Sequence, residues 1–330
     1  MSAPRHWRPL SRAALVVAIA VMSVGFARTG ARCGAGSPQN AQPADHRTEP
    51  PAGAHAQPLR IRIATWNVDR LFDTRCDTGR CGPGEYEPLP TEAELAAQGR
   101  RIAQGIRDLH ADVVLLDEVE DEAALAPVRA SLGDAFPYAA MGHTSAAASI
   151  DVVVLSRFPI VAVSRHEGRD LRRPDGSRTH LTRELLEVTL DPGTGTELVV
   201  FAAHFKSKRN DDTGRRFAEA RYTGEQIAAR AKRSPEALIV LGGDLNDTPD
   251  SNAIAELVRR GALFRVAADA PSDGTYLHGR TREAIDHLFI PSAERSVYVP
   301  GSARVVRTNT RGYAGSDHAA LYADFVLQPR

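Results

Sequence analysis

Acidic, amide and histidine side chains recur in this 330-residue chain directly after short apolar runs. A short, continuous apolar run predicts a buried strand, so these polar side chains are expected at strand ends. Carboxylate and amide oxygens are the ligands that Mg²⁺ and Mn²⁺ prefer, whereas Zn²⁺ favours His and Cys. The pattern therefore predicts an oxygen-rich metal site with histidines beside it. The residues placed in this way are Asn67, Asp69, Asp117, Glu118, His204, Asp244, Asn246, Asp286, Asp317 and His318.

The hydrophobic pattern predicts the strands that must carry these side chains. Ile61 and Ile63 alternate with arginines, which indicates a strand that starts at Leu59 and ends near Asn67. Continuous apolar runs predict further strands, and two late runs predict closing strands. These runs are 113–116, 152–155, 198–203, 238–241, 284–290 and 319–327.

Helices are predicted between these strands. Thr91 and Glu94 form a capping box, and apolar residues then recur at helical spacing as far as Leu109. A second helix spans the region of Phe217 to Ala231, and a third covers Asn252–Arg260. Because strands and helices do not alternate regularly, we expect an α/β fold of mixed sheets packed on each other with helices outside.

Several segments resemble, in the same order along the chain, the motifs of the endonuclease/exonuclease/phosphatase superfamily. The resemblance is to its deoxyribonuclease I-like group, which includes exonuclease III-like AP endonucleases and bacterial secreted nucleases. It covers about residues 59–328 and implies a four-layered α/β sandwich with two mixed β-sheets face to face and helices outside. It also implies metal-dependent hydrolysis of phosphoesters. The matching segments are Ala64–Asp69, Leu116–Val119, Ser156–Ile160, Gly243–Asp247, Ile285–Leu288 and Ser316–His318.

The resemblance implies a role for each matching residue. The metal would be Mg²⁺ or Mn²⁺, with Ca²⁺ as the alternative for a structural ion, and its ligand shell would comprise Glu118, Asn67, Asp69 and Asp317. Water would attack phosphorus in line, with either Asp244 or His318 as the base. His318 would bind the scissile phosphate while Asp286 keeps it charged. The residues implied for catalysis are His204, Asp244, Asn246, Asp286 and His318.

Two positions depart from the superfamily pattern. Asp117 stands where a glutamine is usual, which either alters metal affinity or points away from the site. Ala148-Ser149-Ile150-Asp151 replaces the Arg-Gly-Ile-Asp of many extracellular nucleases. A phosphate-binding arginine is therefore missing at this place, which weakens a strict nuclease assignment.

The substrate is less sharply indicated than the chemistry. Lys206, Lys208 and Arg209 follow His204 and either bind phosphates or form a solvated helix face. The first hypothesis is an endonuclease for DNA or RNA with little sequence preference. The second is a phosphodiesterase or phosphatase for a lipid head group or small phosphoester, and the third is a binding protein without catalysis. Nothing indicates an obligate protein partner.

The N-terminal region reads as an export signal followed by a linker. Arginines precede an apolar run too short for an ordinary membrane span, so 1–27 are predicted as a signal peptide, with an uncleaved membrane anchor as the alternative. Residues 28–57 are rich in Ala, Pro and Gly and predict a disordered linker. The catalytic domain would be 58–330, exported to the periplasm or medium. It holds 35 basic and 39 acidic residues, so only a local basic surface would attract a polyanion.

Two of the three cysteines lie in this domain. Cys76 and Cys81 are five residues apart, and an oxidising compartment would favour a small disulfide loop. The alternative is a pair of metal ligands.

Overall fold

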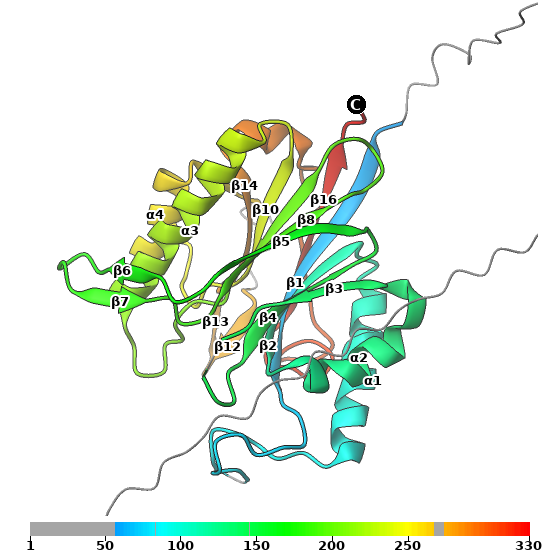
Figure 1. The fold of residues 1–330 in the computed structure, drawn as a ribbon, viewed down its shortest axis with the longest axis vertical. Coiled ribbons are helices and arrows are strands. Elements are labelled where there is room, and N and C mark those ends of the chain that lie inside the picture. The colour runs from blue at the N-terminus through cyan, green and yellow to red at the C-terminus, as the bar shows by residue number, and fades with distance from the viewer. Residues whose placement is uncertain (1–56, 83, 145, 267–273) are drawn as a thin grey trace, which may run out of the picture. The chain divides into compact units, whose positions relative to one another are not determined.

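The computed structural model describes residues 57–330 apart from 83, 145 and 267–273. The predicted signal peptide 1–27, and all of the predicted linker 28–57 except its last residue, lie outside the described residues. Two six-stranded sheets face each other, with helices on both outer sides (Figure 1). The sandwich predicted from the sequence is therefore confirmed.

The first sheet has the order β15-β16-β1-β2-β4-β3. It is mixed, since β1 runs parallel to β2 and antiparallel to β16. Its strands are β15 Arg304–Val306, β16 Ala320–Leu327, β1 Leu59–Leu71, β2 Val113–Val119, β4 Asp151–Ser156 and β3 Tyr138–Met141.

The second sheet has the order β11-β14-β10-β9-β8-β5. It is also mixed, because β10 runs parallel to β9 and antiparallel to β14. Its strands are β11 Leu263–Arg265, β14 Asp286–Pro291, β10 Leu238–Asp244, β9 Leu198–Ala202, β8 Leu185–Leu190 and β5 Ile160–His166. Two hairpins stand apart from both sheets, namely β6 Asp170–Arg172 with β7 Arg178–His180, and β12 Tyr276–His278 with β13 Thr281–Glu283.

Three buried apolar layers hold the sandwich together. Side chains such as Ile63, Val154 and Val240 fill the space between the sheets. A second layer lies between the first sheet and helices α1 (Glu92–Asp108) and α2 (Glu122–Leu132). A third lies between the second sheet and helices α3 (Thr213–Arg233) and α4 (Asn252–Arg260). Because both faces of each sheet are covered, the central strands are apolar on both faces.

Local signals start the helices where they were predicted. The Thr91 hydroxyl accepts from the Glu94 backbone, and the Glu94 carboxylate accepts from the Thr91 backbone, so the capping box is confirmed. Helix α4 has the predicted bounds, with Ser251 as its N-cap. None of the helices in the described part of the chain is long and apolar enough to span a bilayer.

The Ser156–Ile160 segment, which resembles the mid-chain hairpin of the superfamily, does not join two paired strands here. Its flanking strands β4 and β5 lie in different sheets, so they do not pair with each other. The Ser156 hydroxyl donates to the carbonyl of Phe158 and accepts from its amide, both at 2.9 Å. These bonds close the turn that takes the chain from one sheet to the other.

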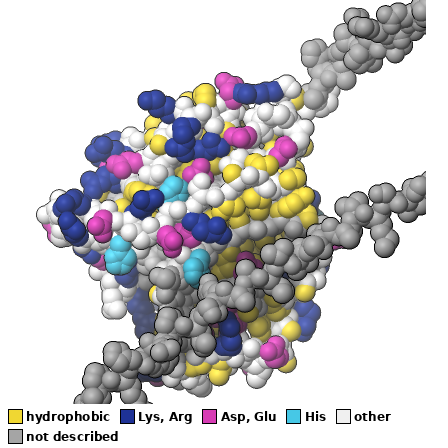
Figure 2. Space-filling model, viewed as in Figure 1, with side chains coloured by type: hydrophobic (Ala, Val, Ile, Leu, Met, Phe, Trp, Pro, Cys, Tyr) yellow, Lys and Arg dark blue, Asp and Glu magenta, His cyan; other side chains and the backbone are white. Residues whose placement is uncertain are grey.

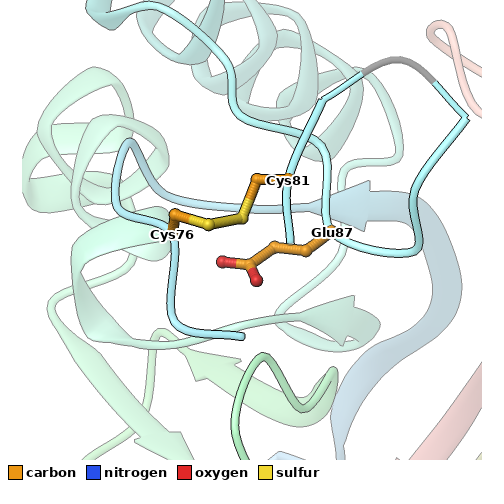
Figure 3. A group of neighbouring side chains, drawn as sticks. All are labelled: Cys76, Cys81 and Glu87. Atoms are coloured by element: carbon orange, nitrogen blue, oxygen red, sulfur yellow. A yellow bond between two sulfur atoms is a disulfide. The ribbon is translucent and has the colours of Figure 1, made fainter. Parts of the chain in front are cut away.

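The loop between β1 and α1 is closed by a Cys76–Cys81 disulfide with the Cα atoms 5.9 Å apart (Figure 3). Glu87 is fully buried beside it and accepts hydrogen bonds from the amides of Asp77 and Thr78. The carboxylate thus satisfies backbone donors of the loop. The disulfide and the hydrogen bonds to Glu87 together fix the conformation of this loop.

Candidate active site

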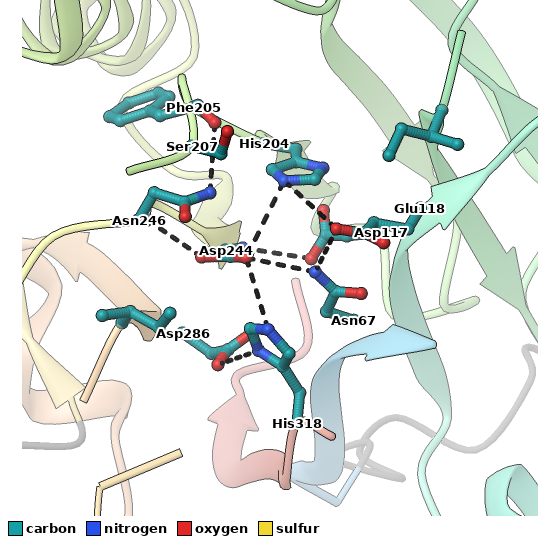
Figure 4. A network of polar contacts seen from close by, with 12 residues as sticks. Asn67, Asp117, Glu118, His204, Phe205, Ser207, Asp244, Asn246, Asp286 and His318 are labelled. Carbon is teal, nitrogen blue, oxygen red and sulfur yellow. Dashed lines mark hydrogen bonds and ion pairs between the residues drawn. The ribbon is translucent and has the colours of Figure 1, made fainter. Parts of the chain in front are cut away.

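The predicted site residues meet at one edge of the sandwich (Figure 4). Because β14 is antiparallel to β10 and β16 is antiparallel to β1, the start of one strand in each pair lies beside the end of the other. Each sheet therefore contributes three chain segments to the same place. The first sheet supplies Asn67, Glu118 and His318, and the second supplies His204, Asp244 and Asp286.

His318 and Asp286 form a buried acid–histidine pair. The His318 Nδ1 atom lies 2.9 Å from Asp286 Oδ2, and its Nε2 atom lies 3.8 Å from Asp244 Oδ2. Burial alone would lower the pKa of His318, but the carboxylates of Asp286 and Asp244 raise it to about 10. The imidazolium can therefore donate from Nε2 toward the centre of the site.

Asp244 lies at the centre of the polar network. Its Oδ2 atom accepts from Asn67 Nδ2 at 3.1 Å, and its Oδ1 atom accepts from the Asn246 backbone at 2.9 Å. Burial and the charge of Asp286 raise the pKa of Asp244 to about 7. A carboxylate with such a pKa is suited to take a proton near neutral pH. Asn246 is held in turn by a bond from Nδ2 to the Phe205 carbonyl.

Three further carboxylates, of Glu118, Asp69 and Asp317, border this network. Burial raises the pKa of Asp69, and the charge of Asp317 raises it further. Burial likewise raises the pKa of Asp317, and Glu118 adds to the effect. Carboxylates that repel one another in this way fit a divalent cation, which would offset their charge.

Asn67 presents its amide nitrogen, rather than its oxygen, to these carboxylates. Its Nδ2 atom donates to Glu118 and Asp244 at 3.1 Å each, while its oxygen accepts from the Asp69 amide. In this arrangement Asn67 holds the two carboxylates side by side. A group of side chains that does have metal-ligand spacing is Asp244, Asp286 and His318, all buried. Since His318 uses Nδ1 to bind Asp286, we interpret this group as the acid–histidine pair.

His204 lies opposite His318 across Asp244. Its Nε2 atom is 3.7 Å from Asp244 Oδ2 and 4.0 Å from Glu118 Oε1. Burial, with the nearby Arg183 charge, moves the pKa of His204 well below its usual range. A neutral imidazole can donate one hydrogen bond to a phosphate oxygen without adding a charge.

The backbone at the site is strained at four residues that are not glycine. Positive φ angles occur at Asp69 (60°), Arg70 (56°), Glu118 (67°) and Asn246 (54°). Such values are uncommon outside glycine and concentrate at functional sites. At Asp69 and Arg70 they coincide with a shift of the β1–β2 register, so β1 continues to Leu71 past its predicted end near Asn67. The shift lets the Arg70 amide donate to Glu118 Oε2 at 3.0 Å.

Asp117 turns inward and does not face the solvent. It is fully buried, and its Oδ2 atom accepts from the Asp244 amide at 3.0 Å. Burial and the charges of Asp244 and Asp286 raise the pKa of Asp117 well above its ordinary value. The alternatives for Asp117 were an effect on metal affinity or a side chain that points away from the metal. The hydrogen bond from the Asp244 amide favours the second alternative, with Asp117 supporting the Asp244 backbone.

The three cations predicted to bind phosphate have different surroundings. Lys206 Nζ donates to the carbonyls of Ser207 (2.8 Å) and Arg209 (2.5 Å). Lys208 pairs with Glu283 at 2.5 Å on the surface. Arg209 is exposed, and no ion pair joins it to another described residue. Surface ion pairs are weak, so Lys208 remains available to a phosphate at little cost.

Arg183 and Glu219 are positioning residues that the sequence patterns did not single out. Arg183 donates to the carbonyls of Ile150 (2.8 Å) and Phe205 (3.2 Å), which brings a guanidinium next to the segment that lacks the expected arginine. Glu219 is buried in α3 and accepts from the amides of Thr182 and Lys206. It thereby ties the segment just after His204 to the loop that precedes β8. For Glu219, the only signal in the sequence was a charged residue next to the apolar stripe of a predicted helix.

Three tyrosines occur in loop-like stretches of the sequence, Tyr86, Tyr276 and Tyr313, and the structure packs Tyr276 against His318. The Tyr276 ring centroid lies 4.8 Å from that of His318. Tyr86 is 45% exposed. Tyr313 is buried instead, where its hydroxyl donates to the Gly105 carbonyl and its ring packs against Trp66.

Solved structures with the same fold include proteins of diverse origin. A Bacteroides thetaiotaomicron endonuclease/exonuclease/phosphatase family protein has a TM-score of 0.60 at 17% identity, covering 82% of this chain and 96% of its own. Sphingomyelinase C from Streptomyces griseocarneus gives 0.57 at 22%, with 81% and 99% covered. D. rerio TDP2 complexed with single-strand DNA product gives 0.55 at 17%, with 81% and 98% covered. At these identities the likeness shows the fold alone.

A search of curated proteins found no match. The model of the Endonuclease/Exonuclease/phosphatase family, however, matches residues 64–318, which include every segment that meets at the site. The chain belongs to the endonuclease/exonuclease/phosphatase family.

Proposed function

We propose that this protein is a secreted, metal-dependent phosphodiesterase, and specifically an endonuclease that cleaves DNA or RNA with little sequence preference. Enzymes of this family generally hydrolyse phosphoesters, and they generally depend on a divalent metal. The buried pair of His318 and Asp286 beside Asp244 supplies a donor and a base for that chemistry.

A basic surface next to the site is the observation that supports a nucleic acid substrate. Besides the buried Arg216, the β6–β7 hairpin (168–181) and the segment after His204 (205–216) hold eight basic and four acidic residues. They form one surface, because Arg173 pairs with Asp212 at 2.7 Å and Arg215 donates to the His180 carbonyl. Figure 2 shows Lys and Arg side chains gathered on the side where the hairpin lies. On a domain with a net negative charge, this surface favours a polyanion.

The same hairpin argues against a membrane-bound lipid substrate. A hairpin that dips into a membrane needs exposed apolar side chains. Here the projecting strands carry Asp170, Arg172, Arg178 and His180, while Leu171 is buried. A lipid head group or small phosphoester is therefore the second candidate.

The residues present can perform in-line hydrolysis of a phosphodiester. The water oxygen forms a bond to phosphorus while the bond to the leaving oxygen breaks, and Asp244 takes the water proton. Asn67 and the Asn246 amide hold Asp244 in place. His318 and His204 donate to the non-bridging oxygens, and the leaving oxygen takes a proton from solvent.

We assign the metal shell to Glu118, Asp69 and Asp317, with Asn67 orienting Glu118. Mg²⁺ or Mn²⁺ bound there would supply positive charge that stabilises the developing negative charge on the phosphate. Oxygen ligands of this kind do not suit Zn²⁺.

The test is incubation of the mature domain with supercoiled plasmid, with Mg²⁺ or Mn²⁺ and with EDTA, beside the Asp244→Ala variant. Nicking that requires both the metal and Asp244 is the expected result. If no metal supports nicking, the endonuclease assignment is wrong, and sphingomyelin and inositol phosphates become the substrates to assay.

Export is part of the proposal and has its own test. The bonded pair of Cys76 and Cys81 is consistent with an oxidising compartment. Fractionation of cells that express the full chain should place the domain in the periplasm or medium. Retention in the cytoplasm would exclude export, and retention in the membrane would favour an uncleaved anchor.

A further inference from the structure

A cavity of about 590 Å³ lies beside the last residues of β1, where Arg70 lines it. Its wall combines aromatic and apolar side chains, two arginines, two glutamates and an amide, and one side comes from the loop stretch that follows the Cys76–Cys81 disulfide. The residues of this wall that carry the argument are Arg70, Phe72, Tyr86, Leu89, Gln98 and Arg209.

Arg70 joins the cavity to the catalytic centre. Its amide donates to Glu118 Oε2 at 3.0 Å, whereas its side chain lines the cavity. The guanidinium carbon lies 5.8 Å from the Phe72 ring centroid and 5.9 Å from that of Tyr86, and it donates to the Tyr86 carbonyl. A ligand that contacts the Arg70 side chain in this cavity would therefore touch the residue whose backbone amide binds Glu118.

The aromatic wall combines a buried ring with an exposed one. Phe72 is 1% exposed and packs edge-on against Tyr86, which is 45% exposed, and Leu89 is 48% exposed. Phe72 thus supports the Tyr86 ring while leaving it accessible. Large exposed apolar side chains at a cavity mark a binding surface.

The shape and hydrogen-bonding groups of the wall, rather than its net charge, favour planar bases over cationic head groups, because its two arginines are balanced by Glu85 and Glu94. A quaternary ammonium group would be attracted by the Tyr86 ring and the two glutamates and repelled by the two arginines. It has no donor or acceptor with which to bond to the Gln98 amide. An unstacked nucleobase suits the same wall, because it stacks on an aromatic ring or a guanidinium plane and bonds to an amide. Arg209 can at the same time contact the adjacent phosphate.

Building on the proposed function, we propose that this cavity is a nucleobase subsite. It would receive one unstacked base next to the cleaved bond, with Tyr86 as the stacking platform, Gln98 as the hydrogen-bonding partner and Arg70 as the link to the catalytic centre. The substrate class would then be single-stranded or locally melted nucleic acid, because a base within an intact duplex cannot enter.

The test compares a short single-stranded oligonucleotide with versions that carry one abasic residue on either side of the cut. Wild-type protein should cleave the natural strand with a kcat/KM about tenfold or more above that of one abasic version. Tyr86→Ala should remove this preference and Tyr86→Phe should retain it. Tyr138→Ala, which removes an exposed aromatic from the sheet-edge strand β3, is the matched control and should change nothing.

The outcomes separate the subsite from the proposed function. If wild-type protein cleaves neither the plasmid nor any oligonucleotide, the proposed function fails and the subsite with it. If it nicks the plasmid but cleaves no oligonucleotide, the subsite alone is wrong. If it cleaves all versions equally, or if Tyr86→Ala keeps the preference, the subsite alone is wrong. A thermal denaturation curve should first establish that the double variant Cys76→Ser/Cys81→Ser is folded. This variant should then raise KM for the natural strand and leave unchanged the KM for the abasic version that the wild type cleaves poorly.

Discussion

His318 and Asp286 come from different sheets and are joined by a 2.9 Å hydrogen bond between two buried side chains. Asp286 thus both orients the ring and keeps it charged. Asp286→Asn should lower kcat by about a hundredfold or more with little change in KM, because the donor to the phosphate is lost. Steady-state kinetics on an oligonucleotide measure this effect. Asp324→Asn, which removes a buried aspartate paired with Arg60 and Arg62, should lower thermal stability yet keep kcat.

The metal assignment can be tested with two glutamates that lie two residues apart at the end of β2. Glu118 faces the catalytic centre, whereas Glu120 accepts from the Asp73 amide in a separate acidic group with Asp121. Glu118→Gln should abolish activity and weaken Mn²⁺ binding, as followed by electron paramagnetic resonance. Glu120→Gln should leave both close to wild type. The reverse pattern would move the metal to the Asp73, Glu120 and Asp121 group.

Prediction from the sequence succeeded where local signals act alone. The Thr91 cap, the bounds of α4 and the buried central strands follow from capping and from continuous apolar runs. Helix α2 was missed, since it is short and has Pro127 inside it. Strand β5 was missed because most of its side chains are at least partly exposed, which removes the apolar signal.

The site residues were found through their order along the chain, but their arrangement was not predictable. The positive φ angles at Glu118 and Asn246 are strained conformations that contacts with the surrounding sheets hold in place. In α3 the predicted apolar face included Phe217, yet the structure buries Arg216 and Glu219. These charges are tolerated because Arg216 pairs with Asp211 and Asp247. Such compensation depends on tertiary contacts that a linear pattern does not contain.

Gly243, next to Asp244, should not tolerate a side chain. Its φ is +147°, and an added Cβ would lie 1.8 Å from the Ala203 carbonyl oxygen. Gly243→Ala should therefore destabilise the domain severely and displace Asp244. Gly279→Ala is the matched control, with φ +59° and no atom within 4 Å of the added Cβ. It should cost only about 1–2 kcal/mol. Thermal denaturation of both variants would show the difference, and equal melting temperatures would contradict the proposed close approach.

Glu294 should make the domain less stable as the pH rises toward neutrality. Its carboxylate accepts from the Ile239 amide at 3.0 Å, but burial raises the pKa of Glu294 from 4.5 to about 7. The folded state therefore binds the proton more tightly than the unfolded state. The associated stability is fully present below about pH 4.5 and is lost as the pH rises through about 7. Glu294→Gln keeps an acceptor without the charge, so its free energy of unfolding should fall less than that of the wild type between these pH values. Urea titrations at several pH values measure the two slopes, and parallel curves would rule out Glu294 as their source.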